Sequence, residues 1–184
     1  MCLILSSDRP RNSTYATESG HILYQVDNPC KTFSEGTATI CKAVWPFQGQ
    51  FVFYGQIEFH AFHSTRLRFN GFEVSVNNYF HKAGLFSMDK IFRASDGKEY
   101  RWKLETNTLK LVRNEGNKLE VAKFKESKPS FGPFSKGRPA SLEVEPSVEQ
   151  ILDEIVLTFI YCHKLKEDNK KSTEIVMNAA TSVS

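Results

Sequence analysis

The strongest hydrophobic pattern of the chain lies near its C-terminal end. Apolar residues in the first turns share one side of a predicted helix, and positions 155–162 (IVLTFIYC) leave no polar side at all. After His163 the chain becomes polar and basic. A helix that is apolar all round is buried on all sides, so the pattern predicts a core helix over about residues 147–168. The side chains predicted to face the core are Ile151, Leu152, Ile155, Val156, Phe159 and Ile160.

Two further features concern the start and the surroundings of this helix. Ser147 followed by Gln150 has the spacing of an N-terminal capping box, with Pro146 just outside it. The all-apolar part has 8 residues, roughly 12 Å of helix, whereas a bilayer needs about 20 residues. We therefore interpret it as the centre of a soluble domain. A membrane-surface helix or a partner-binding helix is the alternative.

Short strand patterns dominate the rest of the chain. Positions 50–60 (QFVFYGQIEFH) alternate with the period of two that is expected of a strand. Gly55 in the middle predicts a bulge or the close approach of another backbone segment. Similar patterns predict strands or hairpins over 2–6, 21–27, 37–45, 50–60, 66–76, 89–104, 107–113, 118–125 and 139–144.

The clearest hairpin is 89–104 (DKIFRASDGKEYRWKL). A three-residue loop over 95–97, with Gly97 in the left-handed conformation, gives the best register. It places Arg93 opposite Glu99 and separates apolar from charged residues. The apolar face comprises Phe92, Ala94, Tyr100, Trp102 and Leu104, and the other face comprises Arg93, Glu99, Arg101 and Lys103.

Many short strands followed by one buried helix define the expected architecture. The fold class is α+β, mainly β: a closed antiparallel β-barrel around a central hydrophobic C-terminal helix. The inward faces of the strands need filling, and the helix needs cover on every side. We expect a single domain over 1–168 and a disordered tail over 169–184, where the sequence is polar and weakly patterned.

Composition limits the number of domains, the binding partners and the cellular location that we expect. A length of 184 residues fits one domain, and a net charge of +3 without a dense basic block gives no support for nucleic-acid binding. The start of the chain has too short an apolar run for a signal peptide, and no transmembrane segment is expected. We interpret the cysteines as reduced thiols of a cytoplasmic protein, because their spacing suits neither a metal site nor a disulfide framework. They are Cys2, Cys30, Cys41 and Cys162.

Three segments together resemble a fungal protein family of unknown function, DUF6593. They are DRPRNSTY near the start, IFRASDGKEYRWKL in the middle, and RPASLEV followed by ILDEIVLTFIYCHKL at the end. The resemblance covers about residues 7–168. That family is similar to the tubby C-terminal-like group, which includes phospholipid scramblases and LURP-one-related proteins. The resemblance implies a closed β-barrel around a hydrophobic C-terminal helix, and fold alone does not fix the function.

A cluster of basic residues is the first candidate site. It comprises Arg93, Lys98, Arg101, Lys103 and Lys110, with Arg113 on the same strand as Lys110. Arginine and lysine side chains on a rigid sheet bind phosphate groups. Because some tubby-like proteins bind phosphoinositides, the expected ligand is an anionic lipid headgroup. The alternative is an ordinary solvated face, in which Arg93 pairs with Glu99.

Other candidate sites carry weaker signals. His60 and His63 point to opposite faces if they lie on a strand. Asp153 and Glu154 are adjacent on the helix and diverge by about 100°, so they do not form a carboxylate pair. We interpret Asp153 as a structural contact to strand backbone or to a basic side chain. Because no phosphate-loop, nucleophile-elbow or CxxC motif occurs, we predict no catalytic residue, metal site or cofactor.

These observations favour a binding protein without catalysis that contacts anionic membrane lipid reversibly through its basic strand face. Two alternatives remain open. The aromatic richness suits an apolar pocket in a small-molecule carrier or a cofactor-independent enzyme, with His60, Tyr54 or His81 as converging polar groups. A protein-interaction module is the other alternative, and it would use the loop over 126–138.

Overall fold

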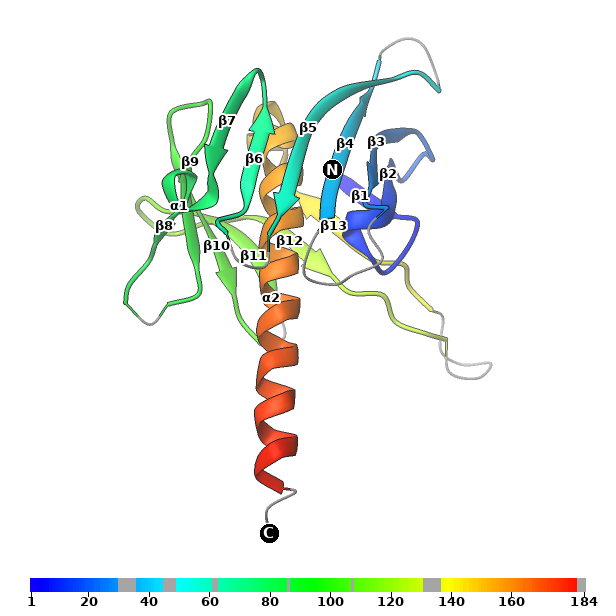
Figure 1. The fold of residues 1–184 in the computed structure, drawn as a ribbon. Coiled ribbons are helices and arrows are strands. Elements are labelled where there is room, and N and C mark those ends of the chain that lie inside the picture. Colours follow the sequence, from blue (N-terminus) through cyan, green and yellow to red (C-terminus); the bar gives the residue numbers. More distant parts are fainter. Residues whose placement is uncertain are drawn as a thin grey trace.

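The protein consists of one large antiparallel sheet and one long C-terminal helix (Figure 1). The computed structural model describes residues 1–29, 36–44, 49–60, 63–85, 87–106, 108–130 and 137–181. The strands are β1 (Cys2–Leu5), β2 (Ser13–Thr17), β3 (Ile22–Asp27), β4 (Gly36–Ala43), β5 (Phe51–Phe59), β6 (Arg66–Phe69), β7 (Phe72–Ser75), β8 (His81–Lys82), β9 (Lys90–Arg93), β10 (Glu99–Leu104), β11 (Leu109–Arg113), β12 (Glu120–Lys125) and β13 (Ser141–Val144). The helices are η1 (Pro10–Asn12), α1 (Val76–Tyr79), η2 (Pro146–Ile151) and α2 (Leu152–Thr181).

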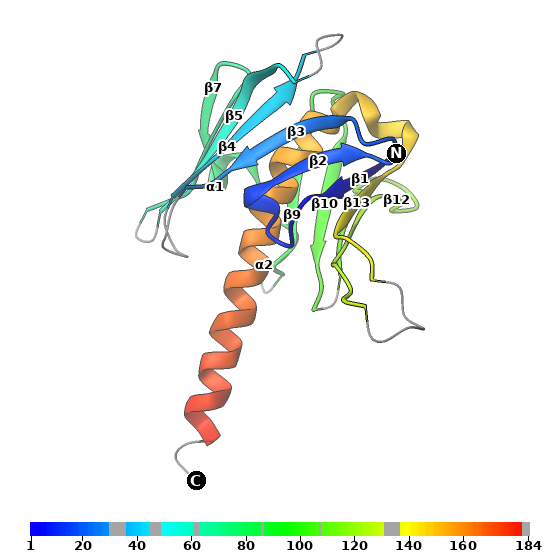
Figure 2. The same ribbon diagram turned by 90° about the vertical axis from the view of Figure 1, so that its right-hand side faces the viewer.

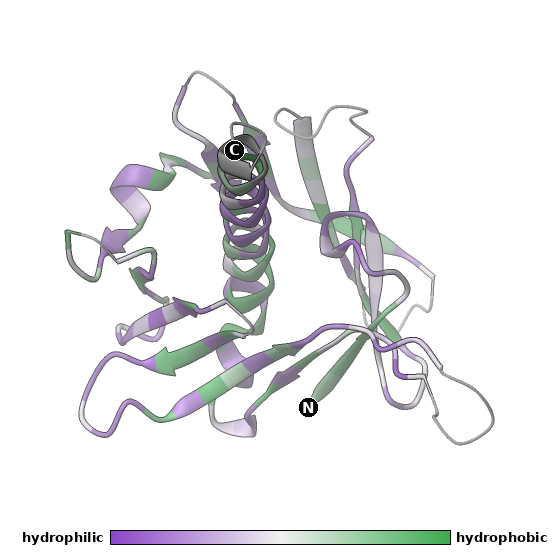
Figure 3. Ribbon diagram, turned by 90° about the horizontal axis from the view of Figure 1, so that it is seen from below, coloured by the Kyte–Doolittle hydropathy of each residue, from purple (hydrophilic) through white to green (hydrophobic). Residues whose placement is uncertain are grey.

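The sheet curves around α2, as the views from the side and from below show (Figures 2 and 3). Its order is β7-β6-β5-β4-β3-β2-β1-β13-β12-β11-β10-β9-β8. Hydrogen bonding does not continue from β7 to β8 within the described ranges. These edge strands are consecutive in the chain, and the single helical turn of α1 joins them. The mainly β, antiparallel architecture with a C-terminal helix is therefore confirmed, but strand pairing does not close the sheet.

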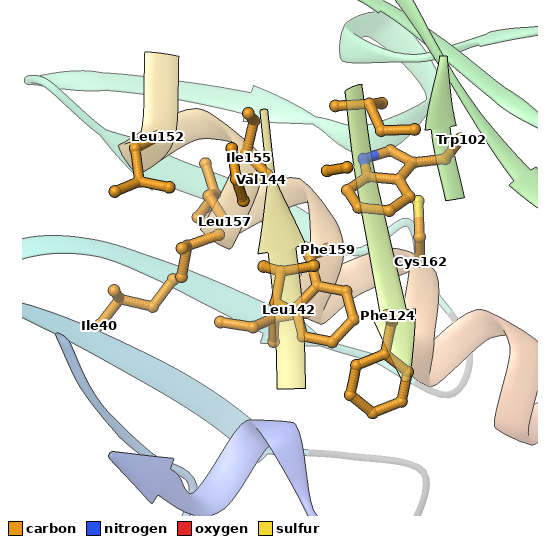
Figure 4. Packing of buried hydrophobic residues seen from close by; sticks show 14 of the residues in the cluster. Ile40, Trp102, Phe124, Leu142, Val144, Leu152, Ile155, Leu157, Phe159 and Cys162 are labelled. Carbon is orange, nitrogen blue, oxygen red and sulfur yellow. The ribbon is translucent and has the colours of Figure 1, made fainter. Parts of the chain in front are cut away.

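The first half of α2 forms the centre of the hydrophobic core. All six side chains predicted to face the core are buried, and Ile155, Val156, Phe159 and Ile160 have no exposed surface. Figure 4 shows Leu157 pointing toward Ile40 of β4, and Phe159 beside Leu142 and Phe124. Strands on different sides of the helix thus pack against one continuous apolar segment, as the uniform pattern at 155–162 predicts.

The boundaries of the helix differ from the prediction. The segment over 146–151 is a 3-10 helix without a side-chain cap, and the hydroxyl of Ser147 accepts a hydrogen bond from Arg113 Nη2 at 3.3 Å instead. The α-helix continues to Thr181, through most of the segment for which the sequence predicts a disordered tail. Side chains within this extension bond one turn back along the helix: the Ser172 hydroxyl donates to the carbonyl of Asp168 at 3.0 Å, and the Thr173 hydroxyl donates to that of Asn169 at 3.0 Å.

The β9–β10 hairpin confirms the predicted register. Gly97 has φ 78°, and its N–H donates to the carbonyl of Ala94 at 2.9 Å. Glu99 lies opposite Arg93, with 3.4 Å between the ion-pairing atoms. The segments β2, α1 and β8 were not predicted. Small polar residues dominate β2 (STYAT), so its burial between β1 and β3 leaves little hydrophobic signal in the sequence.

Gly55 confirms the predicted close approach of another segment. A Cβ atom at this position would lie 2.8 Å from the backbone oxygen of Arg68 on β6 and 3.6 Å from Leu157 Cδ1 on α2. We expect Gly55→Ala to lower the free energy of unfolding by about 1–3 kcal/mol, because β6 must move away. Urea denaturation measures this loss. Gly84→Ala is the control, since its Cβ would meet nothing nearer than 4.0 Å; equal losses in both variants would contradict the prediction.

Candidate functional site

Three lysines form a row across the outer face of β10, β11 and β12. Register pairs Lys103 with Lys110 and Lys110 with Lys123. Their neighbours along the strands, such as Trp102, Leu111 and Phe124, are buried against the core. Because side chains alternate along a strand, the three lysines point to the opposite, solvent-facing side. We call Lys103, Lys110 and Lys123 the lysine row.

Only long ion pairs balance the charge of the lysine row. Like charges that lie directly opposite each other destabilise a sheet. Glu120 lies 3.9 Å from Lys110 and 3.9 Å from Lys123, and Glu105 lies 3.9 Å from Lys110, beyond hydrogen-bonding distance. For Lys103 we find no ion pair among the described residues. The row therefore places three positive charges side by side, with the carboxylates of Glu105 and Glu120 beside them.

Of the other predicted basic residues, Arg101 is held tightly by a carboxylate, whereas Arg93 and Lys98 form only long ion pairs within the described residues. Arg101 binds Asp89, with 2.6 Å between Nη2 and Oδ2 and 2.8 Å between Nε and Oδ2. Arg93 pairs with Glu99, while Lys98 lies 4.0 Å from Asp96. The structure thus brings Lys103 and Lys110 together and adds Lys123. The alternating pattern of the predicted strand over 118–125 places Lys123 on the solvent-facing side. Only the register with the neighbouring strand shows that it belongs to the row.

The carboxylates at the start of α2 fasten the helix to the sheet. Asp153 accepts hydrogen bonds from Tyr24 Oη at 2.5 Å and from Lys42 Nζ at 2.7 Å. The carboxylate of Glu154 accepts the backbone N–H of Ser95 at 3.0 Å, and the Ser95 hydroxyl donates to it as well. Burial, with the nearby Asp153 carboxylate, raises the pKa of Tyr24. The structural interpretation of Asp153 is confirmed, with a basic side chain among its partners.

The histidine pair forms no metal centre within the described residues. His60 follows the end of β5, and its ring centroid lies 6.4 Å from that of His63. His60 Nε2 lies 3.8 Å from Glu58 Oε2. No group of three or more metal-ligating side chains occurs in the part of the chain that the structure describes. His60 and His63 are both exposed to solvent.

A groove of about 390 Å³ lies beside α2, below the core. Phe124 and Ala140 contribute apolar surface, and Glu126, Lys166 and Lys170 are among its charged residues. His163 also lines it, with only 8% of its surface exposed. Its Nδ1 is buried without a hydrogen-bond partner. No sequence pattern singles out this histidine, because only folding brings β12 and α2 together around it.

The surroundings of His163 keep its ring neutral. Burial lowers the pKa of His163 to about 4, with further repulsion from Lys166 and Arg11. Glu167 lies 3.8 Å from Nδ1, and Arg11 binds the same carboxylate at 3.3 Å. A neutral imidazole has one donor and one acceptor nitrogen. The groove can therefore offer one hydrogen bond beside an aromatic surface.

The features that the two alternative functions require do not coincide with the lysine row or with the groove beside α2. Side chains of α2 with no exposed surface occupy the interior of the sheet, where the small-molecule alternative places its pocket. His60, Tyr54 and His81 do not line the groove beside α2. The predicted interaction loop over 126–138 lies partly outside the described residues, and Lys128 and Arg138 pair at its base through two backbone hydrogen bonds of 2.8 Å.

Comparisons with known proteins identify the family. The profile of the Family of unknown function (DUF6593) matches residues 8–168, and the chain therefore belongs to this family. No curated protein and no solved structure matches it. Among the helices in the described ranges, none combines the length and the apolar character that crossing a membrane requires.

Proposed function

We propose that this DUF6593 protein is a non-catalytic membrane-contact protein that binds anionic lipid headgroups, of the phosphoinositide type, through the lysine row. The in-register placement of Lys103, Lys110 and Lys123 is the observation that carries the proposal. Three like charges side by side on a regular sheet lower its stability. An anionic surface offsets this cost, because phosphate groups can bind between neighbouring ammonium groups.

The contacts of the other basic residues are compatible with lipid binding at the same face of the sheet. Arg101 is held by Asp89, and only 23% of its side chain is exposed, so it shapes the site more than it contacts a ligand. Arg93 has 70% of its side chain exposed and only a long ion pair to Glu99, so it remains available at the margin. Lys125 pairs with Glu143 at 2.5 Å, which neutralises the acidic residue opposite Lys123.

We also propose that the fold is related to that of the tubby C-terminal-like group. In this proposal the curved sheet encloses α2 as a barrel would. A sheet that curves around a central apolar helix supports this relationship, as does the joining of its two edge strands by α1. A cytoplasmic location, with reversible attachment to membranes, belongs to the same proposal. The free thiols of Cys2, Cys41 and Cys162 support it, because such thiols persist in reducing compartments.

Vesicle binding tests this function. Sedimentation with phosphatidylcholine vesicles, with and without phosphatidylserine or a phosphoinositide, should show binding only when anionic lipid is present. Each lysine near an anionic surface contributes about 1 kcal/mol. The triple variant Lys103→Gln, Lys110→Gln, Lys123→Gln should therefore bind on the order of a hundredfold more weakly. Binding should also weaken as salt is added.

A matched control removes the same charge elsewhere. Lys118, Lys128 and Lys171 are exposed and lie outside the lysine row, and replacing all three by Gln should weaken binding much less. Equal losses in the two triple variants would show only a dependence on net charge. Unchanged binding after removal of the lysine row would reject it as the site.

A further inference from the structure

Leu85 is the most exposed large apolar side chain in the part of the chain that the structure describes. It lies between β8 and β9, and 93% of its surface is accessible to solvent. Met88 on the same connection is 38% exposed. Neither side chain belongs to the core cluster. An apolar side chain that projects this far into solvent gains free energy when it enters an apolar environment.

Hydrogen bonds constrain the described part of this connection. The N–H of Ser87 donates to the carbonyl of Gly84 at 3.2 Å, so the chain turns sharply at Leu85. Asp89 then fixes the connection to β10, because its carboxylate accepts the Leu104 N–H at 3.0 Å and binds Arg101. Leu85 is thus presented by an anchored turn.

The same anchor places the turn beside the lysine row. Asp89 binds the backbone of Leu104, the residue that follows Lys103. Figure 1 shows the connection between β8 and β9 at the end of the sheet from which the C-terminal half of α2 emerges. Met88 and Leu104 line a groove of about 330 Å³ together with Lys166 and Lys170 of α2. An apolar projection and the first lysine of the row therefore share one corner of the molecule.

Further lysines flank the turn. Lys82 and Lys90 lie directly opposite each other at its base, in an arrangement that is unfavourable for like charges. Lys82 is exposed and has no ion pair to an acidic residue within the described ranges. Lys90 instead lies opposite the buried Trp102 on the core-facing side of the sheet, where burial lowers the pKa of its ammonium group. Glu105 and Glu174 on the groove partly offset Lys166 and Lys170. The base of the turn thus combines exposed apolar atoms with unpaired positive charge, which complements the phosphates and acyl chains of an anionic bilayer.

We propose that Leu85 enters the acyl region of an anionic bilayer while Lys82 and the lysine row contact the headgroups. This inference rests on the proposed function and adds to it the orientation of the molecule on the membrane. The lysines supply long-range attraction that salt weakens, and Leu85 supplies a short-range apolar contact that salt does not screen. Both contributions are needed because one apolar side chain or a few lysines alone bind a bilayer only weakly.

Matched leucine substitutions test the insertion. Leu85→Ser should weaken binding to vesicles of phosphatidylcholine and phosphatidylserine by about tenfold. Leu119→Ser is the control, because Leu119 is 56% exposed on the connection between β11 and β12. It should bind like the unmodified protein. Because Leu85 and Leu119 are both exposed, neither substitution opens a cavity in the core.

A second readout measures the depth of the side chain. In Leu85→Trp, vesicles with brominated acyl chains should quench fluorescence above the background set by Trp45 and Trp102 of the unmodified protein. Quenching equal to that background, together with unchanged binding of Leu85→Ser, would overturn the insertion. If binding still depends on the lysine row in that case, the proposed function stands. Absence of all binding to anionic vesicles would overturn both proposals.

Discussion

Phe159→Ala is expected to remove about 3–5 kcal/mol from the free energy of unfolding. Phe159 has no exposed surface and lies where several parts of the sheet meet. Its ring centroid is 6.5 Å from that of Tyr15, 6.0 Å from that of Trp102 and 4.9 Å from that of Phe124. The neighbouring strands cannot close the cavity, because hydrogen bonds to their own neighbours hold them in place.

Urea denaturation followed by circular dichroism measures this loss. Since small domains have only about 5–15 kcal/mol of stability, the variant should unfold at a much lower urea concentration. Phe159→Leu keeps part of the volume and should lose less. Lys170→Ala, at an exposed position of the same helix, should change stability little. A loss below about 1 kcal/mol for Phe159→Ala would mean that α2 is not the centre of the core.

The central helix could be predicted because its signal is local and uniform. An apolar run without a polar side, at 155–162, has only one stable environment, and the structure provides it. The register of the β9–β10 hairpin could be predicted equally well, because one turn and two alternating segments determine it. The continuation of α2 to Thr181 was not, because polar residues with weak periodicity do not distinguish an exposed helix from an irregular tail.

The candidate site depends on contacts that the sequence does not record. Lys103 and Lys110 were recognised individually, but the row requires the register of three strands, and Lys123 enters it only through that register. Leu85 lies in a stretch without periodicity. Its importance comes from the bond between Asp89 and β10, which joins residues on different elements. Charge pairing shows the same limit: the hairpin pattern predicts Arg93 opposite Glu99, whereas the partner of Arg101 became clear only in the structure.

The groove beside α2 provides the second large expected effect, a loss of stability at acidic pH that depends on His163. Burial lowers the pKa of His163 from 6.5 to about 4. Between these values the unfolded chain binds a proton that the folded protein does not bind. The free energy of unfolding should therefore fall as the pH drops from 6.5 to 4, by about 3 kcal/mol in total from this group.

The charges around His163 indicate how to test this contribution. Lys166 and Arg11 oppose protonation and Glu126 favours it, while the Glu167 carboxylate lies 3.8 Å from Nδ1. Urea denaturation at pH 7 and at pH 4.5 should show a smaller loss for His163→Leu than for the unmodified protein, because leucine does not titrate. The comparison between the two proteins cancels the carboxylates that titrate in both.

Lys166→Met should also reduce the loss, because removing this positive charge raises the pKa of His163. Identical pH dependence in all three proteins would show that water reaches the ring.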